Sequence, residues 1–195
     1  HILCVPRLAA VKGVDLLLQA FAKLPPNGSM PPSGSMPPSG SMPRLVIAGD
    51  GPERPALEAL ASRLGIAGEV DFVGAATRQK VSNLLASALL FCLPSRHEAF
   101  GIVLLEALSF GLPVVATAAG GVPEVLDGGA LGYLVPPDDP EALAAALSKA
   151  AAEGPPAPPE HLKKVVRERY DWGVITARYL SVYEQAIRNQ HTMPT

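Results

Sequence analysis

The chain has 195 residues, of which 48% are hydrophobic and 17% charged, with a formal net charge of −2. This size and apolar content suit one globular domain of ordinary size, with room for a small appendage. The nearly neutral charge gives no reason to expect nucleic acid or an acidic membrane surface as a partner, and no apolar run is long enough and free enough of charge to span a bilayer.

Strand and helix patterns alternate along residues 1–152. The predicted strands are Ile2–Val5, Leu45–Ala48, Val70–Val73, Leu89–Leu93, Val114–Thr117 and Tyr133–Val135. The predicted helices are Val14–Leu24, Pro55–Leu64, Thr77–Ala86, Gly101–Phe110 and Pro140–Ala152. This alternation, together with strands that are apolar throughout, predicts an α/β fold: a doubly wound, Rossmann-like parallel sheet flanked by helices on both faces. Because the chain begins inside a strand, without an initiator Met or a signal pattern, we interpret it as a piece of a longer protein.

A repeated insertion separates the first predicted helix from the second strand. The six-residue unit Gly-Ser-Met-Pro-Pro-Ser begins at Gly28, recurs at Gly34 and is cut short in a third copy. Residues 25–43 lack charge and periodic apolar positions, so we expect disorder. Loops that join a helix to the next strand lie opposite the ligand-binding edge of a doubly wound sheet. We therefore expect the insertion to be functionally idle; a polyproline-type partner motif is the alternative.

A proline-rich linker is predicted at residues 153–159, followed by a helical tail over residues 160–195. The two predicted tail helices are Glu160–Tyr170 and Trp172–Ile187. The second helix has an apolar face, which we expect to pack on the back of the domain or on a domain outside this sequence. The residues of that face are Val174, Ala177, Tyr179, Leu180 and Tyr183.

The cysteines and histidines show no metal-binding pattern. Cys4 and Cys92 both fall in predicted strands. We expect free, buried thiols in a reducing compartment; a close pair is the alternative if the two strands are neighbours. The four histidines lack ligand spacing and no Asp-x-Asp pair is present, so no metal or other cofactor is expected. His97 either touches a ligand or is an ordinary loop residue.

Two glutamates bracket the start of the helix predicted over Gly101–Phe110. Residues 102–108 are apolar apart from Glu106, so we expect this helix to be buried, and buried carboxylates are rare unless they are paired or bound to something. Helical side chains tilt toward the helix N-terminus, where free backbone N–H groups attract phosphate. Glu98 lies just before the same end. The segment therefore predicts a site for phosphate and for sugar hydroxyl groups.

Cations and glycines lie at the ends of other predicted strands. Arg7 and Lys12 follow the first strand, where they could neutralise a diphosphate, or could be solvated surface charges. Gly120 and Gly121 follow the fifth strand. This pair either lets the backbone approach a ligand closely or forms a structural turn.

In this order, the motifs resemble the C-terminal half of the group 1 family of retaining glycosyltransferases, which have the GT-B fold. The resemblance covers essentially the whole chain apart from the insertion. The matching stretches are Arg7-Leu8…Lys12-Gly13, Gly49-Asp50-Gly51-Pro52, Val70…Phe72…Gly74, Pro94-Ser95…Glu98-Ala99-Phe100-Gly101…Glu106-Ala107, Gly120-Gly121-Val122-Pro123-Glu124 and Arg169-Tyr170-Asp171-Trp172. Pro6 and Ala99 depart from the family's usual glycines, and Pro6 removes one backbone N–H near the phosphates.

The resemblance implies roles for the residues of these motifs. Arg7 and Lys12 would hold the diphosphate of a nucleotide-sugar donor, such as a UDP- or GDP-sugar, and stabilise the leaving group. Glu98 would bind sugar hydroxyls and Glu106 the ribose, while the loop after Gly74 would meet the nucleobase. Backbone N–H groups would contact sugar and phosphate from Phe100, Gly101, Ile102 and Val103.

The resemblance also implies that this sequence is half of an enzyme. A glycan, lipid or small-molecule acceptor would bind to a missing N-terminal domain, so we expect the isolated chain to bind nucleotide but to transfer a hexose poorly or not at all. We expect a cytoplasmic protein, with any peripheral membrane contact made by the missing domain. A sugar-nucleotide epimerase, a phosphorylase and a non-catalytic nucleotide-sugar-binding module remain alternatives. A dinucleotide-dependent dehydrogenase is disfavoured because the first strand is not followed by Gly-x-Gly-x-x-Gly.

Overall fold

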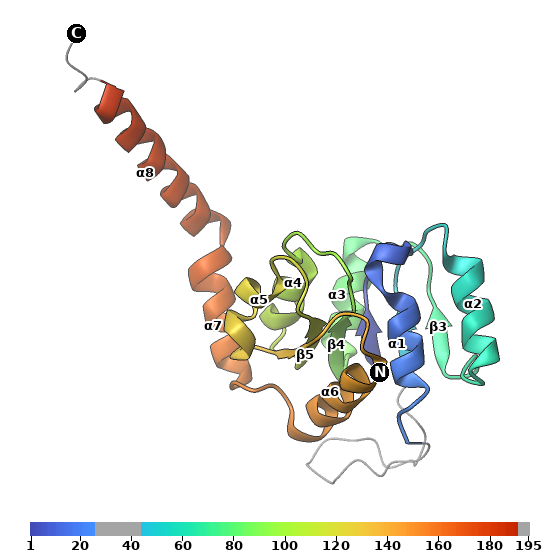
Figure 1. Ribbon diagram of the computed structural model, residues 1–195. Helices are drawn as coiled ribbons and strands as arrows, with labels where there is room; N and C mark the ends of the chain where they lie inside the picture. The colour runs from blue at the N-terminus through green and yellow to red at the C-terminus, as the bar shows by residue number, and fades with distance from the viewer. Residues whose placement is uncertain (26–43, 191–195) are drawn as a thin grey trace.

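Six parallel strands form one sheet in the computed structural model, which describes residues 1–25 and 44–190 (Figure 1). The strands are β1 (Ile2–Cys4), β2 (Leu45–Ile47), β3 (Val70–Phe72), β4 (Leu90–Leu93), β5 (Val114–Thr117) and β6 (Tyr133–Val135). Their order across the sheet is β3-β2-β1-β4-β5-β6, and each neighbouring pair is parallel. All six predicted strands are confirmed. Apart from Pro25, the predicted insertion lies outside the described residues.

The predicted helices are present, with ends that differ by a few residues at most. They are α1 (Val14–Phe21), α2 (Arg54–Arg63), α3 (Arg78–Ser87), α4 (Ile102–Ser109), α6 (Pro140–Glu153), α7 (Pro159–Tyr170) and α8 (Trp172–Gln190). Three short helices were not predicted, because a single turn is too short to show an amphipathic period. They are the 3-10 helices η1 (Ala10–Lys12) and η2 (Asp127–Gly129) and the α-helix α5 (Val122–Val125).

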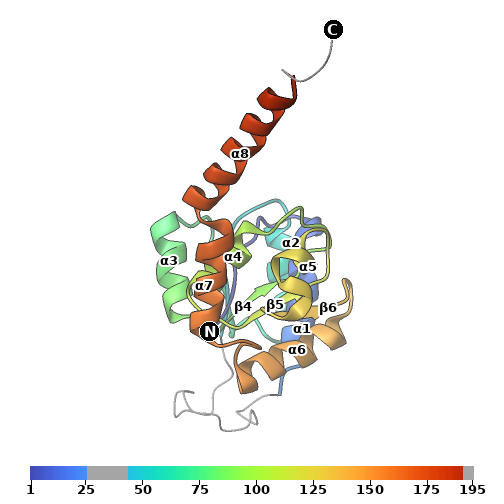
Figure 2. The same ribbon diagram turned by 90° about the vertical axis from the view of Figure 1, so that its left-hand side faces the viewer.

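The sheet has a separate apolar core on each face. Successive side chains of a strand point to opposite faces, so Ile2 and Cys4 join one core while Leu3 joins the other. Helices α1, α2 and α6 cover the first face, and α3, α4 and α7 cover the second (Figures 1 and 2). The result is the predicted doubly wound three-layer α/β fold.

The chain reverses its direction of travel across the sheet between β3 and β4. It runs outward from β1 through β2 to β3, then returns so that β4 pairs with β1, with Ile2 opposite Leu90. Ligands of open α/β sheets bind beyond the carboxyl ends of the strands at such a switch point. The loops that follow β1 and β4 are therefore the first place to look for a site.

Helix α4 is only half-buried, so the expectation of a buried helix around Glu106 was wrong. Its core face consists of Leu104, Ala107 and Leu108. Ile102 is 68% exposed, and Glu106, one turn further along, is also exposed. Residues four apart share a helix face, and this face opens toward α3 instead of packing against it. A short apolar run cannot reveal which of its faces will be covered.

The two tail helices have different surroundings. Helix α7 packs along α4 and buries Leu162 and Val165 in the second core. Helix α8 projects away from the domain (Figures 1 and 2). Val174 and Ile175 in its first turn are half-buried, but its other large apolar residues are exposed, so most of the predicted apolar face does not pack on the back of the domain. Packing on a domain outside this sequence stays a prediction. The exposed residues are Trp172, Tyr179, Leu180, Val182, Tyr183 and Ile187.

Both cysteines are free and fully buried, as predicted. Their strands, β1 and β4, are neighbours in the sheet, which was the condition for the two thiols to lie close together. Burial raises the pKa of the Cys4 thiol to about 12, and burial with the nearby Cys4 raises the pKa of Cys92. A thiol in such surroundings stays protonated and unreactive.

Among the described helices, none has the length and apolar character needed to cross a membrane.

Candidate functional site

The loops after β1, β4 and β5 meet at the carboxyl edge of the sheet, and glycines allow the close approach. A Cβ atom on Gly13 would overlap the carbonyl oxygen of Pro94, and one on Gly120 would overlap that of Glu98. Both glycines have positive φ angles, +62° and +54°. The Gly121 N–H also donates to the Glu98 carbonyl oxygen at 3.1 Å. The glycine pair thus has a structural role between protein loops, and its contact with a ligand stays a prediction.

This convergence brings two of the predicted site residues into contact. Lys12 Nζ lies 2.8 Å from Glu98 Oε2, and the two side chains are 26% and 14% exposed. The Ser95 hydroxyl donates to the same carboxylate oxygen at 3.3 Å. Thr117 in turn donates to the Ser95 carbonyl. The pair is thus oriented by Ser95 from the loop after β4 and, through Ser95, by Thr117 at the end of β5, in surroundings that screen charge less than bulk water does.

The N-terminus of α4 begins directly after this loop. Gly101 has a φ angle of +81°, which turns the chain into the helix, and Leu104 N–H donates to the Gly101 carbonyl at 2.8 Å. Ile102 and Val103 are the first two helical residues, whose N–H groups have no acceptor within the helix. This end carries a partial positive charge. Phe100 packs edge-to-face on Tyr170 of α7, with ring centres 5.9 Å apart, and so anchors the loop.

Glu106 opens into a groove between α3 and α4 with a volume of about 540 Å³. Ile102 and Val103 line the same groove, as does Ala76 from the loop that follows β3. The structure therefore brings together Glu106, the first turn of α4 and the loop predicted to meet a nucleobase. Gly74 itself is buried, and Arg7 is exposed on the loop after β1.

Two further charged residues near the site carried no predicted role. Arg78 lines the groove beside Glu106. Its position directly after the loop that follows β3 is the one sequence feature that could have indicated a place near the site. Arg96 lies between Ser95 and Glu98 and binds the carboxylates of Asp15 and Asp138. Nothing in the sequence indicates these two partners, because they lie on distant segments. The hydrogen bonds from Arg96 are the main reason that the pKa of Asp15 is lowered.

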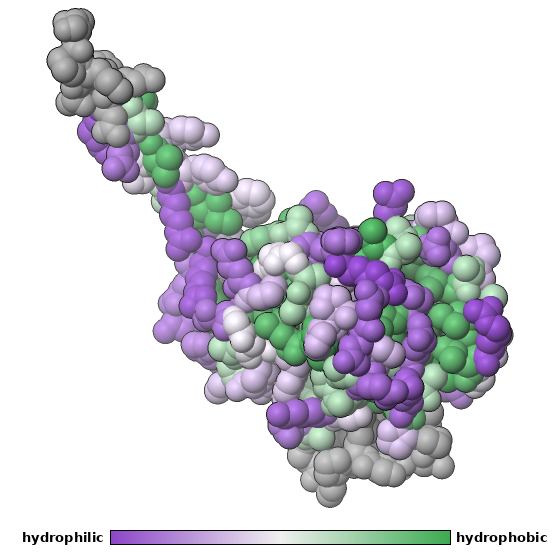
Figure 3. All heavy atoms as spheres, in the orientation of Figure 1, coloured by the Kyte–Doolittle hydropathy of each residue, from purple (hydrophilic) through white to green (hydrophobic). Residues whose placement is uncertain are grey.

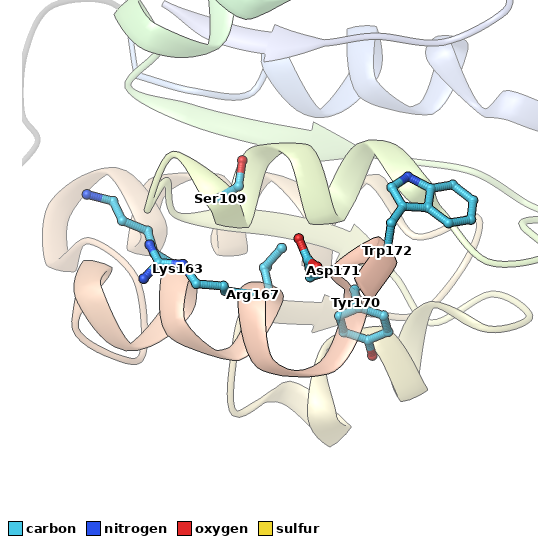
Figure 4. A pocket seen from close by; sticks show the side chains of 7 residues that line it. Ser109, Lys163, Arg167, Tyr170, Asp171 and Trp172 are labelled. Carbon is cyan, nitrogen blue, oxygen red and sulfur yellow. The ribbon is translucent and has the colours of Figure 1, made fainter. Parts of the chain in front are cut away.

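A second hollow, between α4 and α7, contains none of the predicted site residues (Figure 4). It has a volume of about 340 Å³, and Lys163, Arg167 and Trp172 lie along it. Cavity shape alone therefore does not identify the functional site. The candidate site is distinguished instead by the Lys12–Glu98 contact and the helix N-terminus at the switch point.

These features define a Rossmann-like domain whose candidate ligand site lies at the junction of its two halves. Residues 1–169 match the model of the family described as glycosyl transferases group 1, and the chain belongs to this family. The resemblance to group 1, GT-B enzymes that the motifs predicted is thereby confirmed.

Relatives support this assignment from sequence and from structure. The chain is 32% identical over 190 residues to a phosphatidylinositol N-acetylglucosaminyltransferase subunit from Arabidopsis thaliana, covering 96% of this chain and 39% of the relative. It is 33% identical over 196 residues to D-inositol 3-phosphate glycosyltransferase of Mycobacterium avium, covering 96% and 42%.

Solved structures show the same fold. Sucrose-phosphate synthase from Thermosynechococcus elongatus superimposes with a TM-score of 0.80 at 26% identity, covering 96% of this chain and 46% of that one. The Anabaena HepE protein in complex with UDP-glucose superimposes with a TM-score of 0.75 at 26% identity, covering 93% and 48%. The chain thus spans less than half of the length of each of these four relatives.

Proposed function

We propose that this chain is the donor-binding half of a retaining glycosyltransferase that uses a nucleoside-diphosphate sugar. The observation that carries the proposal is the Lys12–Glu98 contact at 2.8 Å, next to the N-terminus of α4 at the switch point. A cation and free N–H groups suit a diphosphate, and a carboxylate suits sugar hydroxyls. The Anabaena relative, whose structure contains UDP-glucose, supports this class of donor.

In this proposal Lys12 and Glu98 bind adjacent parts of the donor. An ammonium group has three N–H donors, and the Glu98 contact uses one of them. The others can reach phosphate oxygens, with Arg7 as a second cation from the same loop. Glu98 keeps its second oxygen, Oε1, for a sugar hydroxyl, while Ser95 and Lys12 hold Oε2. The ion pair therefore orients both side chains before the donor arrives.

The groove between α3 and α4 takes the nucleoside in this proposal. Glu106 accepts hydrogen bonds from the ribose hydroxyls, and the base extends toward Ala76 and the loop after β3. The exposed position of Glu106 suits this role, since a carboxylate inside the core would not reach a ligand. Arg78 lines the same groove and is an additional candidate for contact with the nucleotide.

The proposed reaction retains the configuration at the anomeric carbon by front-side displacement. The bond from that carbon to the diphosphate oxygen breaks, and a bond to the acceptor oxygen forms on the same face. The acceptor proton passes to the leaving diphosphate. Lys12 and Arg7 stabilise the negative charge that develops there, so we propose that no divalent metal is needed. The acceptor binds to the half of the protein outside this sequence, in the cytoplasm; two free, buried cysteines fit such a reducing compartment.

Calorimetry with UDP and GDP tests the proposal. Lys12→Ala removes a charged hydrogen bond and should weaken binding by about 1.5–3 kcal/mol, or roughly 10- to 150-fold. The matched control is Lys23→Ala, which breaks an exposed ion pair with Glu141 far from the site and should leave the affinity unchanged. A chelator should have no effect on the wild type. Equal affinities for Lys12→Ala and the wild type would remove Lys12 from the site.

A further inference from the structure

The Arg96 side chain joins three loops at the carboxyl edge of the sheet. Its Nη1 and Nη2 atoms donate to the two carboxylate oxygens of Asp15, each at 2.7 Å. Its Nε donates to Asp138 Oδ1 at 2.6 Å, and Nη1 also donates to the Ala10 carbonyl at 2.8 Å. The segments linked are the β4–α4 loop, the η1–α1 region and the β6–α6 loop.

Arg96 binds residues on both sides of Lys12 in the sequence. Ala10 lies two residues before Lys12 and Asp15 three residues after it, and both bind the guanidinium. The Arg96 backbone N–H adds a bond to the Val11 carbonyl at 2.8 Å. Arg96 itself lies two residues before Glu98. One side chain thus ties the segment that carries Lys12 to the segment that carries Glu98.

We infer that Arg96 is a positioning residue, which sets the separation of Lys12 and Glu98 and thereby the affinity for the donor diphosphate. This inference rests on the proposed function. Arg96 reaches the donor only through the two residues it positions, so it is not itself a catalytic residue. The Gly121–Glu98 hydrogen bond holds the other side of the same loop. On the side toward Lys12, the side-chain bonds of Arg96 add to the backbone bonds that the Arg96 and His97 N–H groups donate to the Val11 carbonyl.

The geometry requires arginine and not merely a positive charge. A guanidinium presents five N–H donors in a planar fork, so it can hold both oxygens of Asp15 while Nε binds Asp138. A lysine ammonium in the same place cannot reproduce the two parallel bonds. Asp138 contributes from the loop after β6; the next residue, Asp139, caps α6 by accepting from the Ala142 N–H at 2.8 Å. The third loop is therefore anchored as well.

The first test compares Arg96→Met with a matched control, Arg44→Met. Arg44 also forks onto a carboxylate, with Nε 2.7 Å from Asp71 Oδ2, but it precedes β2 at the opposite edge of the sheet. Calorimetry with UDP and GDP should show binding weakened at least about ten-fold by Arg96→Met and by less than about two-fold by Arg44→Met. Arg96→Lys should not restore the affinity. Asp138→Ala, at an exposed partner, provides a milder variant should Arg96→Met fold poorly, and should give an intermediate loss.

A double-mutant cycle separates positioning from general destabilisation. If Arg96 acts by placing Lys12, then Lys12→Ala should weaken UDP binding much less in the Arg96→Met background than in the wild type. A variant that is only less stable would show additive losses. Additive losses, or affinity of Arg96→Met within about two-fold of the wild type, would overturn the inference while leaving the proposed function in place.

Amide hydrogen exchange provides a readout that needs no ligand. In Arg96→Met, the amides of residues 96 and 97, which donate to the Val11 carbonyl and so hold the loop to the segment that carries Lys12, should exchange at least about ten-fold faster. The amide of Leu3 in β1 should keep its protection. Unchanged loop protection would also overturn the inference. Failure of the wild type to bind either nucleotide would instead refute the proposed function, and the exchange data would still show whether Arg96 orders the loop.

Discussion

Glu98 and Lys12 are separated by 86 positions in the chain, yet their side chains form one ion pair. Each residue could be assigned from the sequence to the end of a strand, because strand ends are marked by the change from apolar to polar residues. Their contact could not be predicted, because it depends on β1 and β4 being neighbours. A residue's chemical type is thus readable from the sequence, while its partner depends on the fold.

Asp15 should make stability depend on pH in the acidic range. Its ordinary pKa is 3.8, and the hydrogen bond from Arg96 lowers the pKa in the folded state. A lowered folded pKa means that the stabilisation is present above the unfolded pKa and is lost as the pH falls toward the folded one. The free energy of unfolding of the wild type should therefore exceed that of Asp15→Asn at neutral pH, and the difference should shrink below about pH 4.

Urea unfolding at several pH values between about 6 and 3 measures this difference. In the Arg96→Met background, Asp15→Asn should have little pH-dependent effect, because the cation that lowers the pKa is gone. A wild-type advantage that stays constant down to the lowest pH would show that Arg96 does not stabilise the ionised Asp15.

At the scale of elements, the sequence predicted every strand and each helix of more than one turn. Long apolar runs and helical periodicity persist over enough residues to be recognised. The helix α4 was predicted, but its burial was not predicted correctly, because Ile102 and Glu106 both face the groove. Whether a helix face is covered depends on how far the neighbouring helix stands from it. That distance is set by the sheet and the loops, not by the residues of the helix itself.

Helix α8 should contribute little to the stability of the domain. Six of its large apolar side chains are between 56% and 81% exposed, and green, hydrophobic residues are visible on the surface of the projecting helix (Figure 3). A chain ending at Asp171 should therefore unfold with a free energy within about 1 kcal/mol of the full chain. Circular dichroism during urea unfolding provides the measurement.

Removing α7 as well gives the contrasting control. This helix buries Leu162 and Val165, each worth roughly 1.5–3 kcal/mol when fully buried. A chain ending at Pro158 should be far less stable than one ending at Asp171. Equal stability of these two chains would mean that α7 does not belong to the core, and a large loss on removing α8 alone would contradict its exposed position.

At the scale of the whole molecule, the alternation of strands and helices predicts the three layers but not the strand order. Several orders are compatible with the same alternation, and the choice depends on which connections can pack against the sheet. The convergence of the loops after β1, β4 and β5 was nevertheless predictable, because the loops at the carboxyl ends of parallel strands share one edge. The groove beside α3 was not, since it requires the relative placement of two helices.

Binding and transfer should separate when this chain is compared with the full-length protein. The chain contains the proposed donor site, so its affinity for UDP or GDP should be within about three-fold of that of the full-length protein. Transfer of a labelled sugar, with release of nucleoside diphosphate, should occur only with the full-length protein, because we propose that the acceptor binds to the part of the protein outside this sequence. Turnover by the chain alone would contradict this division, and interconversion of free nucleotide sugars would favour an epimerase.

The Lys12–Glu98 contact also determines how much of the domain must fold before the proposed nucleotide site exists. One partner belongs to the first β-α-β unit and the other to the second, so a fragment with only one unit has no complete site. Contacts between such distant positions form late, after the chain has lost most of its freedom. Under the proposed function, nucleotide affinity therefore reports on cooperative folding of the entire sheet, and a molecule that captures the nucleotide must already have assembled both units.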